Sequence, residues 1–161
     1  MASPFYLRNI IKNKSAELIA FEMFHETGMY AVTSCGSEMI ISEMASIEKN
    51  EDLKKEMARL QERPQLSVSS IASGAHYLVK VKYRENPTPQ MIFAIAQEVV
   101  TLWPTSYLCL VTPIGFFFDS CSDIIEREGD IALIDASLVS PEIQDKYLKS
   151  VNDTIKQKGA E

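Results

Sequence analysis

Apolar and polar residues recur along this chain with two different periods. Residues 66–83 alternate with period two around a central Ser-Gly pair, which predicts a hairpin whose second strand is half-buried. Residues 89–102 carry apolar side chains at the helical period and nearly all round, so we expect a core helix packed on more than one side. Thr88 before Pro89 predicts the start of this helix, because threonine caps helices and proline is tolerated at the first position.

The second half of the chain continues with apolar segments separated by turn residues. Residues 106–111 and 114–119 suit two paired strands, and residues 131–138 read as a further strand. A Ser-Pro pair at 140–141 then predicts the start of a last amphipathic helix. The expected seam of this helix consists of Ile143, Tyr147, Leu148, Val151 and Ile155.

The first third of the chain admits two interpretations. Our preferred prediction is a meander of three strands over residues 17–44, and the competing prediction is a helix over residues 4–25. From Asn50 to Arg63 a thin apolar stripe and a charged opposite face predict a surface helix, which Pro64 ends.

These elements predict one α+β domain over residues 1–161. We expect a mostly antiparallel sheet of about six to eight strands with three or four helices, because consecutive strand segments argue against regular βαβ alternation. Residues 1–14 are expected to form a flexible arm, and residues 157–161 a frayed end. A length of 161 residues suffices for a sizeable core without disulfides or metals.

Charge changes the picture by excluding one class of partner and by its uneven distribution. The net charge is −6, opposite in sign to what an electrostatic nucleic-acid binder needs. Residues 1–80 carry nine basic and ten acidic side chains, whereas residues 81–161 carry seven and twelve. We therefore expect no nucleic-acid partner, and we expect no membrane partner because no apolar run approaches the length of a membrane span.

The acidic excess is concentrated in residues 119–135, where Arg127 is the only basic residue. The acidic residues of this segment are Asp119, Asp123, Glu126, Glu128, Asp130 and Asp135. Counted from Asp119, an EF-hand would need glycine where Ile124 stands and glutamate where Asp130 stands, so the spacing does not fit a calcium loop. The segment is predicted either to be a solvated loop or to bind a protein partner with a basic surface.

No catalytic or metal motif is present in the sequence. The two histidines, His25 and His76, are isolated, and the three cysteines have no Cys-x-x-Cys spacing. Glycine-rich phosphate loops are missing, so we expect no cofactor and no metal. A site pairing Cys109 with His76, or Cys35 with His25, stays an alternative that sequence spacing does not test. The lack of an export signal leads us to expect a cytoplasmic location.

These observations favour a non-enzymatic protein-interaction module, such as an adaptor, an assembly chaperone or an inhibitor, that forms a homodimer. Its size, acidity and mixture of sheet and helices resemble the general profile of acidic dimeric secretion chaperones and small adaptor folds. One alternative is a small-ligand-binding domain or enzyme with an aromatic-lined pocket, and another is a structural subunit of a larger assembly. The candidate pocket residues are Tyr77, Tyr83, Trp103, Tyr107, Phe116 and Phe118.

Overall fold

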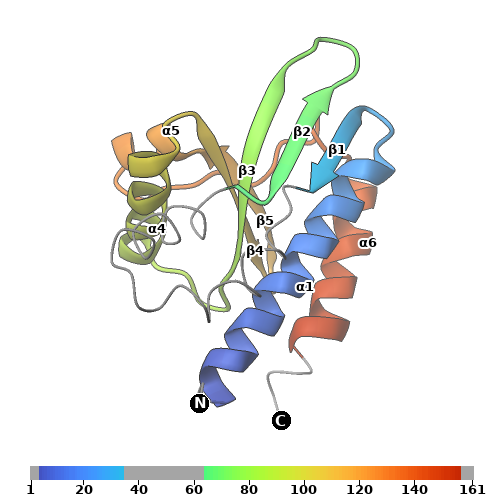
Figure 1. Cartoon of the computed structure of the whole chain (residues 1–161). Helices are drawn as coiled ribbons and strands as arrows, with labels where there is room; N and C mark the ends of the chain where they lie inside the picture. Colours follow the sequence, from blue (N-terminus) through green and yellow to red (C-terminus); the bar gives the residue numbers. More distant parts are fainter. Residues whose placement is uncertain (1–3, 35–63, 157–161) are drawn as a thin grey trace, which may run out of the picture.

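The computed structural model describes the backbone of residues 4–34 and 64–156, and the side chains of residues 11–34 and 64–155. These residues form an α+β structure in which one mixed five-stranded sheet has helices on both faces (Figure 1). The elements are α1 (Pro4–Glu26), β1 (Tyr30–Ser34), β2 (Leu66–Ser70), β3 (His76–Tyr83), α4 (Pro89–Leu102), β4 (Ser106–Thr112), β5 (Gly115–Ser120), α5 (Cys121–Glu126), α6 (Pro141–Val151) and the π-helical turn η1 (Asn152–Lys156).

The strands lie side by side in chain order, from β1 to β5. Three neighbouring pairs are antiparallel, but β3 and β4 are parallel because α4 crosses over between them. The predicted hairpin over residues 66–83 is confirmed as β2 and β3, and the predicted paired strands are confirmed as β4 and β5. The α+β class is confirmed, but the described residues contain five strands where six to eight were expected, and the mostly antiparallel character is matched only in part, because the sheet is mixed.

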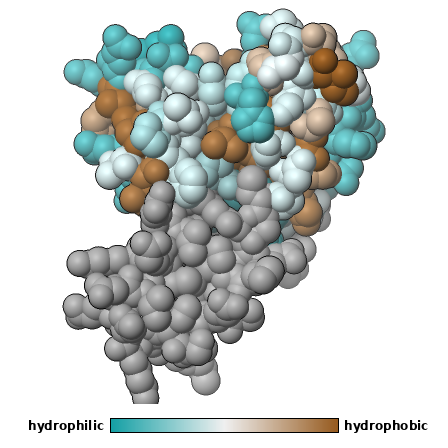
Figure 2. Space-filling view, turned by 45° about the horizontal axis from the view of Figure 1, so that its top comes forward, coloured by the Kyte–Doolittle hydropathy of each residue, from teal (hydrophilic) through white to brown (hydrophobic). Residues whose placement is uncertain are grey.

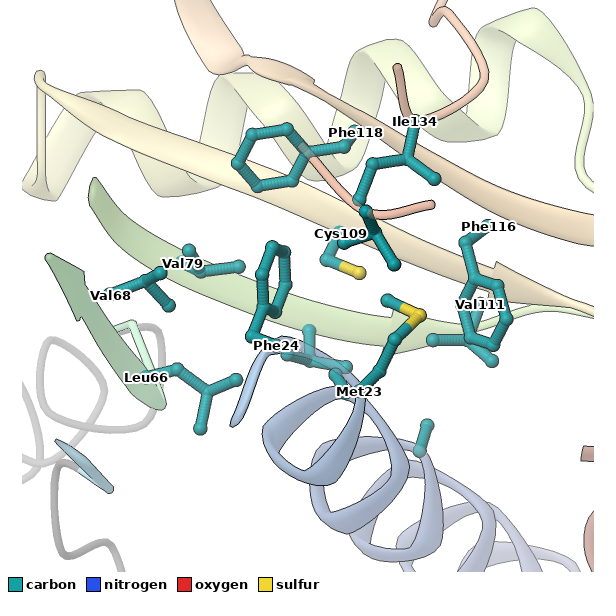
Figure 3. Packing of buried hydrophobic residues seen from close by; sticks show 14 of the residues in the cluster. Met23, Phe24, Leu66, Val68, Val79, Cys109, Val111, Phe116, Phe118 and Ile134 are labelled. Carbon is teal, nitrogen blue, oxygen red and sulfur yellow. The ribbon is translucent and has the colours of Figure 1, made fainter. Parts of the chain in front are cut away.

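Helix α1 replaces the first strand of the predicted meander. Ala16, Ala20, Met23 and Phe24 are buried at helical spacing, and their side chains pack on the sheet. Figure 3 shows Met23 and Phe24 directed at the face of the sheet that carries Cys109. The preferred prediction is therefore wrong over residues 17–26, because this packing selects the competing helix.

On the same face, α6 runs beside α1 and in the opposite direction (Figure 1). Its predicted start is confirmed, since Ser140 Oγ accepts a hydrogen bond from the Ile143 backbone N–H at 3.4 Å. Lys146 Nζ also forms an ion pair with Glu26 at the end of α1. The two helices thus enclose the larger core cluster between themselves and the sheet.

Helix α4 covers the opposite face of the sheet together with α5 (Figure 1). Thr88 Oγ1 accepts a hydrogen bond from the Met91 backbone N–H at 3.2 Å, which confirms the predicted cap. The expectation that this helix packs on more than one side is wrong within the described residues, because Met91 and Ala94 are exposed. Its buried stripe consists of Ile92, Ile95, Ala96 and Val99.

Residues 131–138 do not form the regular strand that their apolar character predicts. Only one bridge, between Phe117 and Leu133, joins this segment to β5. Asp135 bends the chain away, since its carboxylate accepts a hydrogen bond from the Ser137 backbone N–H at 2.7 Å. The turn at Asp135 therefore ends the pairing with β5 after this single bridge.

Other expectations concern the ends of the chain and its first third. Residues 4–14, assigned above to an arm, are the first half of α1. The second strand of the predicted meander is confirmed as β1. Residues 35–44 of the meander, the helix from Asn50 to Arg63, and residues 157–161 lie outside the described residues, and so does Cys35. In the part of the chain that the structure describes, no helix is long and apolar enough to cross a membrane.

Candidate interaction groove

An open groove of about 730 Å³ lies between three segments that are distant in sequence. One wall is formed by residues 85–89, which lead into α4, and the other by residues 127–130, which follow α5. The turn between β4 and β5 contributes Ile114 at the open side. We call this feature the α4–α5 groove.

The floor of the α4–α5 groove is apolar. It consists of Ile92, Leu110 and Ile131, which are buried, and Phe117, which is half-buried. These residues belong to or pack on the core cluster on the α4 face of the sheet. Ile114 is 81% exposed, which is unusual for so large an aliphatic side chain at the rim of an apolar hollow.

The acidic wall is positioned by the way α5 ends. The backbone N–H of Glu128 donates to the Ile125 carbonyl at 3.1 Å, and that of Gly129 donates to the Ile124 carbonyl at 2.8 Å. This pair of bonds is a Schellman motif, in which the residue after the cap adopts a left-handed conformation. Glu128 occupies that position with φ +58°, although glycine is the residue usually found there.

The two walls meet where Gly129 packs against Pro89. Gly129 is buried and has φ +97°, and a Cβ atom built on it would overlap the carbonyl oxygen of Pro89. Only glycine permits both this backbone conformation and this approach. The loop after α5 is therefore held against the start of α4, which fixes the shape of the groove.

The charges at the rim are unequally compensated. Arg127 forms a 2.8 Å ion pair with Asp119, and Glu85 forms a 3.3 Å ion pair with Lys12. Glu128 and Asp130 are exposed, and neither forms a salt bridge with another described residue. The rim therefore presents, beside an apolar floor, two carboxylates that no described cation pairs with; these are called uncompensated below.

The structure divides the predicted acidic segment instead of joining it into one surface. Glu128 and Asp130 line the groove, whereas Asp123 and Glu126 lie on α5. Asp119 pairs with Arg127 at the end of β5. Asp135 stabilises its own turn, and the hydrogen bonds from Ser137 lower the pKa of its carboxyl group.

The six predicted pocket residues are divided between the two faces of the sheet. Five of them lie in or against the core cluster on the α1 face of the sheet, and Trp103 packs against the cluster on the other face. The rings of Tyr77, Tyr107 and Phe118 contact one another, with Tyr107 and Phe118 stacked at 5.3 Å between centroids. Of the six, Tyr77 alone lines a described hollow, which is a second one near the start of β1.

The residues of a nucleophilic site are not assembled among the described residues. Cys109 is fully buried, and burial raises the pKa of its thiol to about 12. His76 is exposed, and its ring nitrogens are hydrogen-bonded with the hydroxyls of Ser67 at 3.3 Å and Ser69 at 2.7 Å. Within the described ranges, no cluster of three metal-ligating side chains is found.

Sequence reasoning identified the acidic wall of the groove but missed its floor and its opposite wall. Two local signals marked other parts of the groove: the Glu-Gly pair after a short helix, typical of a helix end, lies in the acidic wall, and the aliphatic Ile114 inside a Pro-x-Gly turn lies at the rim. No local signal in the sequence indicated that Gly129 would lie against Pro89. Comparison with protein-family models, curated proteins and solved structures finds no match for this chain.

Proposed function

We propose that this protein is a non-catalytic interaction module whose α4–α5 groove binds a partner segment that combines an apolar side chain with a lysine or arginine. The observation that carries this proposal is the pairing of an apolar floor with two uncompensated carboxylates on one rim. An apolar residue of the partner would cover Phe117 and Ile114. A neighbouring cation would lie beside Glu128 and Asp130.

The charge of the rim favours a basic partner over an acidic one. Opposite charges across an interface raise the association rate and discriminate against wrong partners. Arg127 does not cancel the attraction, because Asp119 already balances it. The selectivity should therefore reside mainly in Glu128 and Asp130.

The backbone at Glu128 supports the same interpretation. A non-glycine residue in the left-handed region is strained, typically by about 1–3 kcal/mol, and such strain gathers at functional sites. Glycine would end α5 without that strain, but it would remove the carboxylate from the rim. A requirement for the charge explains why glutamate occupies this position.

A peptide-binding experiment tests the proposal. The probe is a fluorescein-labelled octapeptide of alternating leucine and lysine, compared with the same peptide carrying glutamate for each lysine. Fluorescence anisotropy should show binding of the basic peptide alone, weakening as salt is raised. Amide chemical shifts should change at Ile114, Phe117 and Glu128.

Variants locate the binding to the groove. Glu128→Gln should weaken binding by about 1.5- to 5-fold, the range for one exposed charge pair, and Ile114→Ser should weaken it without loss of stability. Glu98→Gln removes an exposed carboxylate of α4 outside the groove and is the matched control. Equal binding of both peptides, or equal effects of Glu128→Gln and Glu98→Gln, would contradict the proposal.

The expected homodimer and the cytoplasmic location stay predictions. Size-exclusion chromatography with light scattering measures the first directly: a protein that remains monomeric at high concentration would rule the homodimer out.

A further inference from the structure

The two edges of the sheet differ in how they are covered. At the β5 edge, residues 132–134 follow the strand: Phe118 donates to the Ala132 carbonyl at 2.9 Å, and Ile134 donates to the Phe116 carbonyl at 3.0 Å. At the other edge, β1 pairs with β2, and no other described strand lies beside it. The β1 edge is the one that the described residues leave open.

The direction of the unpaired backbone groups follows from the register. The Ile71 backbone N–H donates to the Met29 carbonyl at 2.9 Å. Backbone groups alternate between the two sides of an antiparallel strand, so those of Ala31 and Thr33 also face β2. The N–H and C=O groups of Tyr30, Val32 and Ser34 therefore point out of the sheet.

Strand β1 lacks the features that usually protect a sheet edge. Charged side chains, proline and bulges prevent edge pairing in many proteins, but the sequence Tyr-Ala-Val-Thr-Ser contains no charge and no proline. Its register with β2 is uninterrupted from Tyr30 to Ser34. An extended backbone can therefore pair with β1 without electrostatic repulsion from its side chains.

A second hollow of about 480 Å³ lies at the N-terminal end of this strand. It is lined by ten residues, none of them charged, among which Met29, Tyr30, Ile71, Tyr77 and Leu138 are the large ones. The Tyr30 hydroxyl donates to the Leu138 carbonyl at 2.9 Å and holds one side in place. Ile71 is 69% exposed, so the hollow, called here the β1 pocket, has an apolar rim.

Figure 2 views the end of the sheet that carries the β2–β3 turn, where the β1 pocket lies. On this face several separate apolar patches lie among hydrophilic and neutral residues. Such isolated patches suit the docking of single side chains better than the burial of a broad surface.

We propose that the β1 edge binds an extended, uncharged segment of a partner protein as a sixth strand, with one aliphatic or aromatic side chain in the β1 pocket. The backbone hydrogen bonds to Tyr30, Val32 and Ser34 supply affinity, and the pocket supplies specificity. The absence of charge from both the strand and the pocket lining matches an uncharged segment. This site shares no lining residue with the α4–α5 groove and does not depend on its function.

A second copy of this chain fits the site less well than a different protein. Suppose that the β1 strands of two copies pair antiparallel along their whole length, with a two-fold axis at Val32. Ser34 of one copy then lies beside Tyr30 of the other. A serine would then lie nearest the β1 pocket, whose lining is mostly apolar. The occupant should therefore carry a larger apolar residue at that position.

The test uses a blocked heptapeptide of alternating valine and threonine with a central phenylalanine. Hydrogen exchange on the full-length protein should show that this peptide protects the amides of Tyr30, Val32 and Ser34. The same peptide N-methylated at alternate residues should not protect them, because it lacks the backbone N–H groups that would donate to the outward carbonyls of β1. Protection of these amides without peptide would overturn the proposal: protection that increases with protein concentration would show pairing with a second copy, and protection that does not would show pairing with another segment of this chain.

Two proline variants provide matched controls on adjacent residues. Val32→Pro removes an outward N–H, so it should keep the fold and weaken peptide binding by about fivefold, the effect of one hydrogen bond. Thr33→Pro removes an N–H that faces β2, so it should disrupt β1 itself. Ile71→Ser should weaken binding of the phenylalanine peptide but not of a peptide with alanine in its place. Unchanged binding by Val32→Pro, or no amide protection at millimolar peptide, would overturn the proposal.

Discussion

Substitution of Gly129 by alanine is the sharpest test of how the groove is built. The backbone at Gly129 has φ +97°, which strains any residue with a Cβ by about 1–3 kcal/mol. The added methyl group would also lie 2.7 Å from the carbonyl carbon of Pro89, and relieving such overpacking costs a further 1–3 kcal/mol or so. We expect Gly129→Ala to lower the free energy of unfolding by about 2–6 kcal/mol.

Gly74 provides the matched control for this substitution. It has φ +74° in the β2–β3 turn, and no atom lies within 4 Å of a Cβ built on it. Gly74→Ala should therefore show the backbone strain without the contact. Urea denaturation of both variants measures the difference, and a Gly129→Ala protein as stable as Gly74→Ala would refute the packing of Gly129 on Pro89.

Three further substitutions or treatments have expected outcomes that follow from single positions. Glu128→Gly should raise the unfolding free energy by about 0.5–1 kcal/mol, because the relief of left-handed strain is partly offset by the backbone entropy that glycine loses on folding. It should also weaken binding of the basic peptide; urea denaturation and anisotropy measure the two effects. The Tyr83 hydroxyl is buried with no described hydrogen-bond partner, so Tyr83→Phe should stabilise the fold by about 1 kcal/mol in calorimetry. Burial also raises the pKa of the Tyr83 hydroxyl from 10.0 to about 12. Between these pH values the native state keeps a proton that the unfolded state loses, so stability should fall as the pH rises, and it should fall less steeply in the phenylalanine variant. In a Cys35→Ser background, Cys109 and Cys121 should not react with Ellman's reagent at pH 8 until denaturant is added, since burial raises the pKa of each thiol to about 12.

Much of the second half of the fold could be predicted because its signals are local. The Thr88-Pro89 and Ser140-Pro141 pairs determine where two helices start, and both caps are formed by atoms three residues apart. The alternation over residues 76–83 likewise determines a strand, because side chains on a strand face opposite sides. The segment at residues 17–26 is different, since apolar residues there fit either a strand or a helix until a sheet face selects one.

The candidate site could be predicted only in part for the same physical reason. The sequence shows that residues 119–135 are acidic, but charge density does not show which carboxylates are compensated. Arg127 and Asp119 become partners through the turn after α5, and Asp135 is occupied by its own turn. The two carboxylates left at the groove emerge only after these contacts are known.

By itself, the sequence determined the periods, the caps and the turns of this protein, because each depends on neighbours within one or two helical turns. It also determined where the negative charge is concentrated. The tertiary structure alone decided that β3 and β4 are parallel, that Gly129 approaches Pro89, and that β1 forms an open edge among the described strands. These features join residues tens of positions apart, and they arise from packing on the two faces of one sheet, which no local pattern encodes.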